Sequence, residues 1–282
     1  MYEQHFGLTS RPFKAVSTGA DVFVGPQTAK IMQAIKLAMT TSDAVITVMG
    51  PAGIGKSTIV GRTLSGLDGQ KLTVRIARMK LAHDEVLDFL LEEFQAANIP
   101  ASTIRKVALF RELVADRTAA GIHVSIVVED ATRIGEDALA ELEALTSSDG
   151  VEYSGAMLVL MGDESLRDQL DSSALVRLKQ RVRAYQFVNP LSAPELGAYM
   201  KHCFRLAGGD YGNLFDATAT EYIHALTGGN PRTTNNLLEA VLNAAATRSL
   251  SNIENSLIAD IAGNDFGMSA DLPAEAEPEV SE

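Results

Sequence analysis

Val45-Ile-Thr-Val-Met-Gly-Pro-Ala-Gly-Ile-Gly-Lys-Ser57 is the stretch of this sequence that decides its fold. It begins with β-branched or apolar residues and no breaker, which predicts a short buried strand. Gly50 to Ser57 then match G-x-x-x-x-G-K-[ST] at every fixed position. We expect a helix to begin directly after this loop. A strand, a glycine-rich loop and a helix in this order predict a site for a nucleoside triphosphate.

The residue types of this loop suit phosphate chemistry. Glycines let the backbone turn tightly and bring its N–H groups close to phosphate oxygens. Lys56 supplies a positive charge for the β- and γ-phosphates, and the Ser57 hydroxyl is placed to ligate Mg²⁺. The expected cofactors are therefore ATP and Mg²⁺. The predicted nucleotide-binding residues of the loop are Gly50, Pro51, Ala52, Gly53, Ile54, Gly55, Lys56, Ser57 and Thr58.

Length and composition indicate a soluble protein with more than one compact unit. The chain has 282 residues, of which 46% are hydrophobic and 21% charged, as is typical of globular proteins. No apolar run approaches the ~20 residues of a membrane span, and the start lacks the pattern of a signal peptide. We therefore expect a cytoplasmic location. The lone Cys203 excludes an intramolecular disulfide and is expected to fill the core.

The net charge of −12 argues against a general attraction to nucleic acid. Residues 266–282 contain five acidic residues and no basic one, and they are rich in Pro and Ala. Such a segment has too little apolar surface to offset its ordering entropy, which predicts a disordered acidic tail. Two basic clusters keep a nucleic-acid partner open: Arg75, Arg78 and Lys80, and Arg177, Lys179, Arg181 and Arg183.

Strands and helices alternate before residue 190. Besides the first strand, strands are predicted at 72–77, 124–128 and 156–161, and helices at 28–39, 84–95, 102–120 and 137–145. This alternation predicts βαβ units and a mainly parallel sheet. Ligands bind beyond the carboxyl ends of strands in such sheets. Because Gly50, Glu129 and Asp163 all follow predicted strands, we expect them to share one pocket.

Only helices are predicted from residue 190 onward, at 195–207, 216–227, 233–248 and 252–262. Ser192, Pro194 and Glu195 form a capping sequence for the first of them. The predicted organisation is an irregular arm (1–26) packed on the core, an α/β domain (27–189), a small all-α lid (190–265) and the tail. Within the arm, Phe23 and Val24 are candidates for a wall of the adenine site.

These features together resemble the AAA+ ATPases, and in detail the bacterial general-secretion-pathway A-type ATPases. The matching segments are Met1-Tyr2, Phe6-Gly7-Leu8, Pro12-Phe13, Gly50–Ser57, Glu129-Asp-Ala131, Gly162-Asp-Glu-Ser-Leu166, Leu178-Lys-Gln-Arg-Val182 and Gly229-Asn-Pro-Arg-Thr-Thr-Asn-Asn-Leu237. The resemblance implies a three-layer P-loop fold with a parallel sheet, followed by a small all-α lid.

The resemblance also implies roles for single residues. Glu129 would belong to the Mg²⁺ shell, together with Ser57, and Asp130 would orient the attacking water. Arg232 falls where a lid arginine reaches the nucleotide. Arg181 falls where relatives carry an arginine finger for a neighbouring subunit, with Arg177 and Arg183 as competitors. Relatives usually read Asp-Glu at the strand end, so the reversed order here predicts slow hydrolysis.

The implied function is ATP binding and hydrolysis coupled to assembly into a homo-oligomer and to remodelling of an unidentified protein partner. In related systems that partner is envelope, secretion, pilus or polysaccharide-export machinery, which places the protein in the cytoplasm or at the periphery of an inner-membrane complex. Two alternatives stay open. One is a DNA-associated AAA+ ATPase of the transposition-regulator or origin-recognition type. The other is a nucleotide-gated scaffold without turnover.

Overall fold

A computed structural model describes residues 2–13, 19–39, 43–66, 70–77, 81–148 and 155–271. The chain divides into two compact units. The α/β unit comprises Pro26–Ala52 and Lys56–Val188, and the helical unit comprises Met1–Gly25, Gly53–Gly55 and Asn189–Glu282. Arg78, Lys80 and residues 272–282 of the predicted tail lie outside the described residues.

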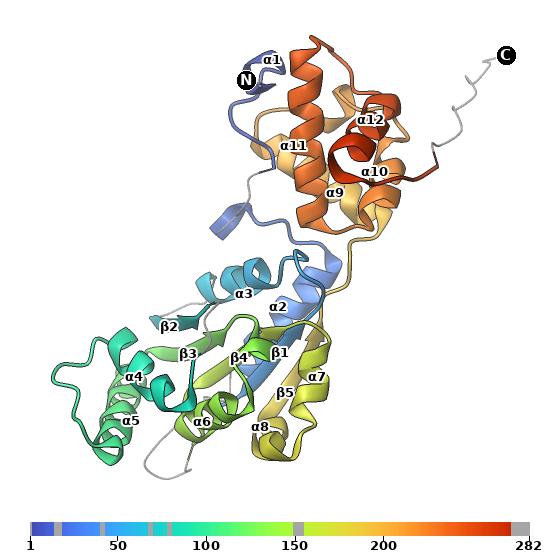
Figure 1. Ribbon diagram of the computed structural model, residues 1–282. Helices are drawn as coiled ribbons and strands as arrows, with labels where there is room; N and C mark the ends of the chain where they lie inside the picture. Colours follow the sequence, from blue (N-terminus) through green and yellow to red (C-terminus); the bar gives the residue numbers. More distant parts are fainter. Residues whose placement is uncertain are drawn as a thin grey trace. The chain divides into compact units, whose positions relative to one another are not determined.

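The α/β unit is built on a five-stranded, all-parallel sheet with the strand order β2-β3-β4-β1-β5 (Figure 1). The strands are β1 (Val45–Met49), β2 (Lys71–Ile76), β3 (His123–Val128), β4 (Met157–Gly162) and β5 (Val182–Phe187). Every residue of β1 and β4 is buried, as continuous apolar runs in a parallel sheet predict. The predicted α/β fold class is confirmed.

The edge strand β5 was absent from the sequence prediction. Its residues alternate between half-buried and exposed, with Arg183, Tyr185 and Phe187 exposed. It pairs with β1 alone among the described strands. Only one side of an edge strand packs against the core, so β5 lacks the apolar run that identified the other strands.

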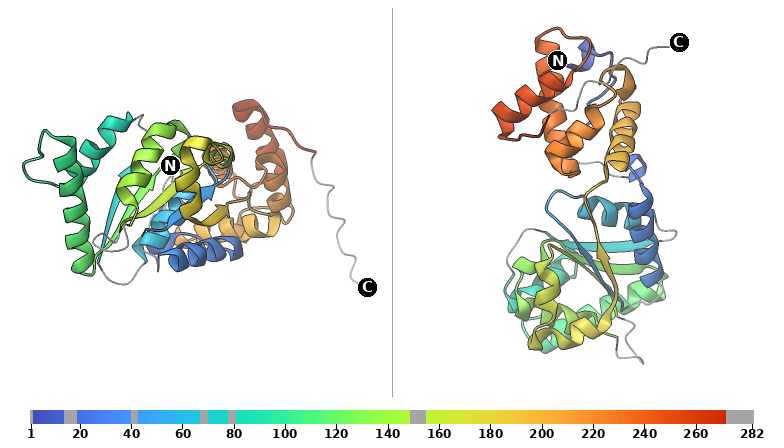
Figure 2. Two further views of the ribbon diagram at one scale, coloured as in Figure 1. Left: turned by 90° about the horizontal axis from the view of Figure 1, so that it is seen from below. Right: turned by 90° about the vertical axis from the view of Figure 1, so that its right-hand side faces the viewer.

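Helices cover both faces of the sheet (Figure 2). On one face, α2 (Pro26–Ala38) packs on α3 (Lys56–Ser65). The opposite face carries the larger hydrophobic cluster of this unit, formed by the remaining helices together with sheet residues. Those helices are α4 (His83–Glu93), α5 (Thr103–Ala119), α6 (Glu136–Thr146), α7 (Ser165–Leu170) and α8 (Val176–Arg181).

The helical unit has its own hydrophobic core. Its main helices are α9 (Ala193–Leu206), α10 (Ala219–Thr227), α11 (Pro231–Thr247) and α12 (Asn255–Phe266). The Glu195 carboxylate accepts a hydrogen bond of 3.0 Å from the Ser192 backbone N–H, so the predicted cap is present. Burial of Cys203 raises the pKa of its thiol to about 11, which fits a core residue rather than a nucleophile.

The N-terminal arm packs on the helical unit, whereas our expectation of an arm packed on the core did not specify which unit supplies the contacts. Tyr2, Leu8 and Phe13 are buried in the helical cluster. The Tyr2 hydroxyl donates to the Glu239 carboxylate of α11 at 2.6 Å, and the Thr9 backbone N–H donates to the Ala207 carbonyl at 2.8 Å. The apolar residues of the arm do not recur at the spacing of a helix or a strand. The sequence therefore indicates that the arm packs against another part of the chain, but it does not indicate which part.

The first residues of the predicted tail are also part of the helical unit. Phe266 ends α12, and Phe266, Met268 and Ala270 pack against the helical core. The Met268 backbone N–H donates to the Ala262 carbonyl at 2.9 Å, and Gly267 adopts φ 64°, as expected of a helix that ends in a Schellman-type turn. The prediction that disorder begins at residue 266 is therefore wrong for residues 266–270.

Two shortened chains test where the packed region ends. A chain ending at Asp265 loses two large, partly buried side chains, Phe266 and Met268, and we expect it to be less stable by about 1–3 kcal/mol. A chain ending at Asp271 keeps these contacts and should lose much less stability than the chain ending at Asp265. Calorimetry of both chains checks this. Equal melting of all three proteins would show that the contacts of Phe266 and Met268 do not stabilise the unit.

Candidate nucleotide site

The glycine-rich loop follows β1, as predicted. Gly53 and Gly55 adopt φ values of 80° and 101°, a region that L-residues with side chains rarely enter. The Gly50 backbone N–H donates to the Gly162 carbonyl at 3.2 Å, which ties the start of the loop to the end of the neighbouring strand β4. Helix α3 begins at Lys56, so its N-terminus follows the loop directly. This arrangement suits the binding of a phosphate chain.

The side chain of Lys56 lies over its own loop. The Lys56 ammonium group donates to the Gly50 carbonyl at 2.7 Å and to the Pro51 carbonyl at 2.9 Å. Lys56 is half-buried and is the first residue of α3. The same ammonium hydrogens are suited to phosphate oxygens, so phosphate has to compete with two carbonyls for this group.

The carboxylate pair follows β3, and its first member is ion-paired. Arg75 Nη1 of β2 donates to Glu129 Oε1 at 3.1 Å. A Cβ atom at Gly61 of α3 would lie 3.3 Å from Arg75 Nη2. Arg75 therefore lies between the helix that follows the loop and the carboxylate predicted to hold Mg²⁺. Sequence reasoning placed Arg75 in a basic cluster and missed this pair.

Asp130 and Asp163 complete this edge of the sheet. Asp130 is exposed and adopts φ 52°, a left-handed conformation that Asp tolerates better than most residues. Asp163 Oδ1 accepts from the Ser165 backbone N–H at 3.0 Å and from its hydroxyl. Asp163 thus organises the first turn of α7. The structure brings Gly50, Glu129 and Asp163 to the carboxyl ends of β1, β3 and β4, the adjacent central strands.

The Arg75–Glu129 pair leads to a prediction about Mg²⁺. Arg75→Met keeps the aliphatic length but frees the Glu129 carboxylate from a competing cation. A pair of this exposure contributes up to about 1 kcal/mol, so we expect half-saturation at about fivefold lower Mg²⁺. Titration of ATP binding with Mg²⁺ measures this change. Lys179→Met is the matched control, because it breaks an exposed pair with Asp171 elsewhere in the unit.

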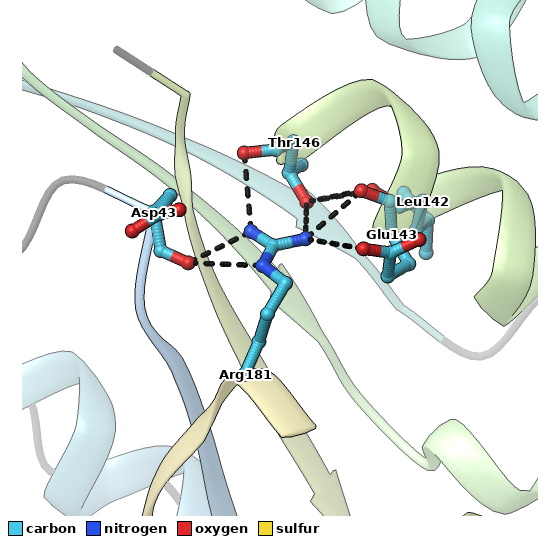
Figure 3. A network of polar contacts seen from close by, with 5 residues as sticks. All are labelled: Asp43, Leu142, Glu143, Thr146 and Arg181. Atoms are coloured by element: carbon cyan, nitrogen blue, oxygen red, sulfur yellow. Dashed lines mark hydrogen bonds and ion pairs between the residues drawn. The ribbon is translucent and has the colours of Figure 1, made fainter. Parts of the chain in front are cut away.

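The position of Arg181 contradicts its predicted role as an arginine finger (Figure 3). Arg181 ends α8, immediately before β5, and thus lies at the amino-terminal edge of the sheet, opposite the loop. Its guanidinium donates to the Asp43 carbonyl at 2.7 Å, the Glu143 carbonyl at 2.9 Å and the Thr146 carbonyl at 3.1 Å. The side chain is only 13% exposed. A group so engaged within its own chain is not available to a neighbouring subunit.

The remaining predicted residues lie in the helical unit. Arg232 is exposed in the first turn of α11, where the Asn230 side chain accepts from the Arg232 backbone N–H at 3.0 Å. Asn230 thus explains the Asn-Pro-Arg sequence as a helix start. The Phe23 ring packs against Tyr199 and His202, and Val24 is 43% exposed. Contacts of these residues with adenine or phosphate stay a prediction.

Comparisons with known proteins agree with this fold. A family model described as an AAA domain matches residues 39–170. General secretion pathway protein A of Aeromonas hydrophila is 26% identical over 252 residues, which are 88% of this chain and 45% of that protein. The chain therefore spans about half the length of this relative.

Two solved structures show the likeness of the fold. The ORC2 protein of Aeropyrum pernix has a TM-score of 0.68 at 13% identity, with 93% of this chain and 72% of that chain covered. CDC6P of Pyrobaculum aerophilum has a TM-score of 0.69 at 12% identity, with 90% and 70% covered. The resemblance predicted from the sequence is thus confirmed: residues 39–170 match the AAA domain model, in a chain that is similar to a general secretion pathway protein A.

Proposed function

We propose that this protein binds Mg·ATP, hydrolyses it slowly, and works by nucleotide-dependent self-association and remodelling of a protein partner. One observation carries the proposal. The glycine-rich loop with Lys56 follows β1, and Glu129 and Asp130 follow β3, so both groups stand at the same edge of one parallel sheet. This edge is where such sheets bind ligands.

The residues have separate tasks in this proposal. Lys56 would bind the β- and γ-phosphates, and Ser57 and Glu129 would hold Mg²⁺, which would supply charge neutralisation at the transferred phosphoryl group. Asp130 positions water with a side chain one methylene shorter than the usual glutamate. A misplacement of about 1 Å can lower a rate about 10²-fold. Slow basal hydrolysis follows from this shorter reach.

A second copy of the chain is the proposed partner of the β5 edge. Tyr185 and Phe187 are 44% and 37% exposed there, next to the exposed Arg183. Among the described residues, no carboxylate oxygen lies within 4 Å of a guanidinium nitrogen of Arg177 in α8 or of Arg183 in β5. These two arginines, rather than Arg181, are our candidates for a group acting in trans on a neighbour's nucleotide.

Phosphate release measured against protein concentration tests this function. We expect specific activity to rise with concentration in step with ATP-dependent assembly followed by light scattering. Arg177→Ala and Arg183→Ala are then each mixed with Lys56→Ala protein. The variant that lost the trans arginine should regain activity in hybrid assemblies. Concentration-independent activity from a monomer would contradict self-association, and ATP binding without phosphate release would favour the scaffold.

The partner is proposed to be envelope, secretion, pilus or polysaccharide-export machinery. This proposal is supported by similarity to a protein named for the general secretion pathway. We further propose a location in the cytoplasm or at the periphery of an inner-membrane complex. None of the helices in the described part of the chain combines the length and apolar character that crossing a bilayer requires.

A nucleic-acid partner is less well supported. Three members of the two basic clusters already have partners within the chain. Arg75 pairs with Glu129, Lys179 pairs with Asp171, and Arg181 is bound by backbone carbonyls. Phosphate binding would have to compete with these contacts, and the net charge of −12 opposes the approach of DNA.

A further inference from the structure

A groove of about 580 Å³ lies on the helical unit, and of the candidate nucleotide-site residues only Phe23 lines it. Phe23 of the arm lines one part of it. Lys201, His202 and Arg205 line another part from α9, and the loop that follows α9 contributes Asp210. All of these residues belong to the helical unit. The groove is therefore formed within one compact unit.

Hydrogen bonds fix the shape of this groove. His202 Nε2 lies 2.8 Å from the Asp21 carbonyl, which can only accept, so Nε2 carries the hydrogen. Nδ1 is then an acceptor for Arg205 Nη2 at 3.2 Å. The Phe23 ring packs 5.7 Å from the His202 ring. The arm, the imidazole and the guanidinium thus hold one another in place.

The groove carries positive charge in an acidic chain. Lys201 and Arg205 are both exposed and stand four residues apart on α9, about 6 Å from each other. Within the described ranges, neither has a carboxylate oxygen within 4 Å. Asp210 uses Oδ1 to accept from the Gly212 backbone N–H at 3.1 Å. Two cations beside an aromatic wall suit a carboxylate-bearing peptide.

We propose that this groove binds the acidic C-terminal segment of the same chain, residues 272–282. The segment continues from Met268 and Ala270, which pack on the core of this unit. Its acids Glu275, Glu277 and Glu279 alternate with other residues. In an extended peptide, alternate side chains face the same side about 6.6 Å apart. That spacing matches the two cations of α9.

The other residues of the segment suit the same mode of binding. Pro273 and Pro278 disfavour helix at the residues before them and favour extended backbone. Extended proline-containing peptides bind grooves lined by aromatic rings, and Phe23 supplies such a ring here. The segment spans up to about 36 Å when extended, comparable with the width of a domain of this size.

Zero-length carbodiimide cross-linking of the full chain tests the contact, because it joins an amine only to a carboxylate that touches it. We expect Lys201 to be linked to Glu275, Glu277 or Glu279, with much lower yields at Lys30 and Lys36, which are exposed on α2. The triple variant Glu275→Gln, Glu277→Gln, Glu279→Gln should lose the link. Equal yields at the three lysines, or no link at Lys201, would overturn the proposal.

An equal mixture of ¹⁴N- and ¹⁵N-labelled protein distinguishes binding of a chain's own segment from binding of the segment of a second copy. Links within one chain join peptides of the same label, and this is the result expected here. Links that join different labels as often as the same label place the segment on a second copy. That outcome overturns binding within the chain.

Binding of a fluorescent peptide with the sequence of residues 272–282 gives an independent measure. The peptide is titrated into the full-length triple Gln variant, whose own tail no longer competes. Adding Lys201→Glu and Arg205→Glu should lower its affinity at least about tenfold, whereas adding Lys30→Glu and Lys36→Glu should change it less than about twofold. Equal effects of the two pairs, with unchanged melting of both proteins, would show that the groove does not recognise the segment.

Discussion

Replacing Arg181 with alanine should destabilise the α/β unit by about 3–5 kcal/mol, the cost of leaving buried partners of a removed charge unpaired. The guanidinium joins the end of α8, where Arg181 lies, to Asp43, two residues before β1, and to the last turn of α6. Its loss removes the two guanidinium N–H groups that donate to the Asp43 carbonyl, whereas the Thr146 carbonyl keeps the Ala156 backbone N–H at 3.0 Å. We expect the midpoint of urea unfolding of this unit to lie at a clearly lower urea concentration than in the parent protein. We also expect the backbone amides of β5 to exchange hydrogen faster.

Two control variants separate this structural role from a role in trans. Arg181→Lys keeps the charge but lacks the planar fork, so it should restore only part of the stability. Arg177→Ala removes an exposed arginine from the same helix and should change stability by less than about 0.5 kcal/mol. A stable Arg181→Ala protein that regained ATPase activity when mixed with Lys56→Ala would restore the arginine-finger assignment.

Replacing Lys56 with alanine should lower ATP turnover at least about 100-fold, as expected when one charged contact to the reacting phosphates is lost. The Lys56 ammonium also holds the Gly50 and Pro51 carbonyls. Because these bonds lie within one loop on the surface, their loss should lower stability by only about 1 kcal/mol. Phosphate release and binding of a fluorescent ATP analogue measure the two functional effects.

Lys30→Ala serves as the matched control, because Lys30 is exposed on α2 and has no assigned role in binding. It should bind and hydrolyse ATP like the parent. Unchanged nucleotide affinity in the Lys56→Ala protein would remove the assignment of the glycine-rich loop. A large drop in melting temperature would instead assign Lys56 to the structure of the loop.

Much of the α/β unit could be predicted because its central strands are short apolar runs followed by glycine or carboxylate residues. Such runs identify β1, β3 and β4, and the parallel arrangement then brings Gly50, Glu129 and Asp163 to one edge. β5 escaped prediction because half of its side chains face solvent. The Arg75–Glu129 pair could have been predicted from the sequence, because Arg75 lies near the end of β2, the strand that pairs with β3.

Other features depend on groups that sequence patterns do not reveal. The motif around Arg181 gives the position of an arginine but not its acceptors, which are mostly backbone carbonyls. The arm posed a different difficulty. Tyr2 meets Glu239 across 237 residues of sequence, and a segment without period carries no signal for so distant a partner.

The arm also determines the order in which parts of this protein can fold during synthesis. Residues 2–13 leave the ribosome long before α9 to α12, on which they pack. At about 5–20 residues per second, some 190 intervening residues take roughly 10–40 s to be made. The α/β unit is complete at Val188 and can close while the helical unit is still being made, whereas Tyr2, Leu8 and Phe13 have to wait unburied. The helical unit is therefore the last part to fold, and a nascent chain halted near Val188 would expose Tyr2, Leu8 and Phe13, apolar side chains that chaperones can recognise.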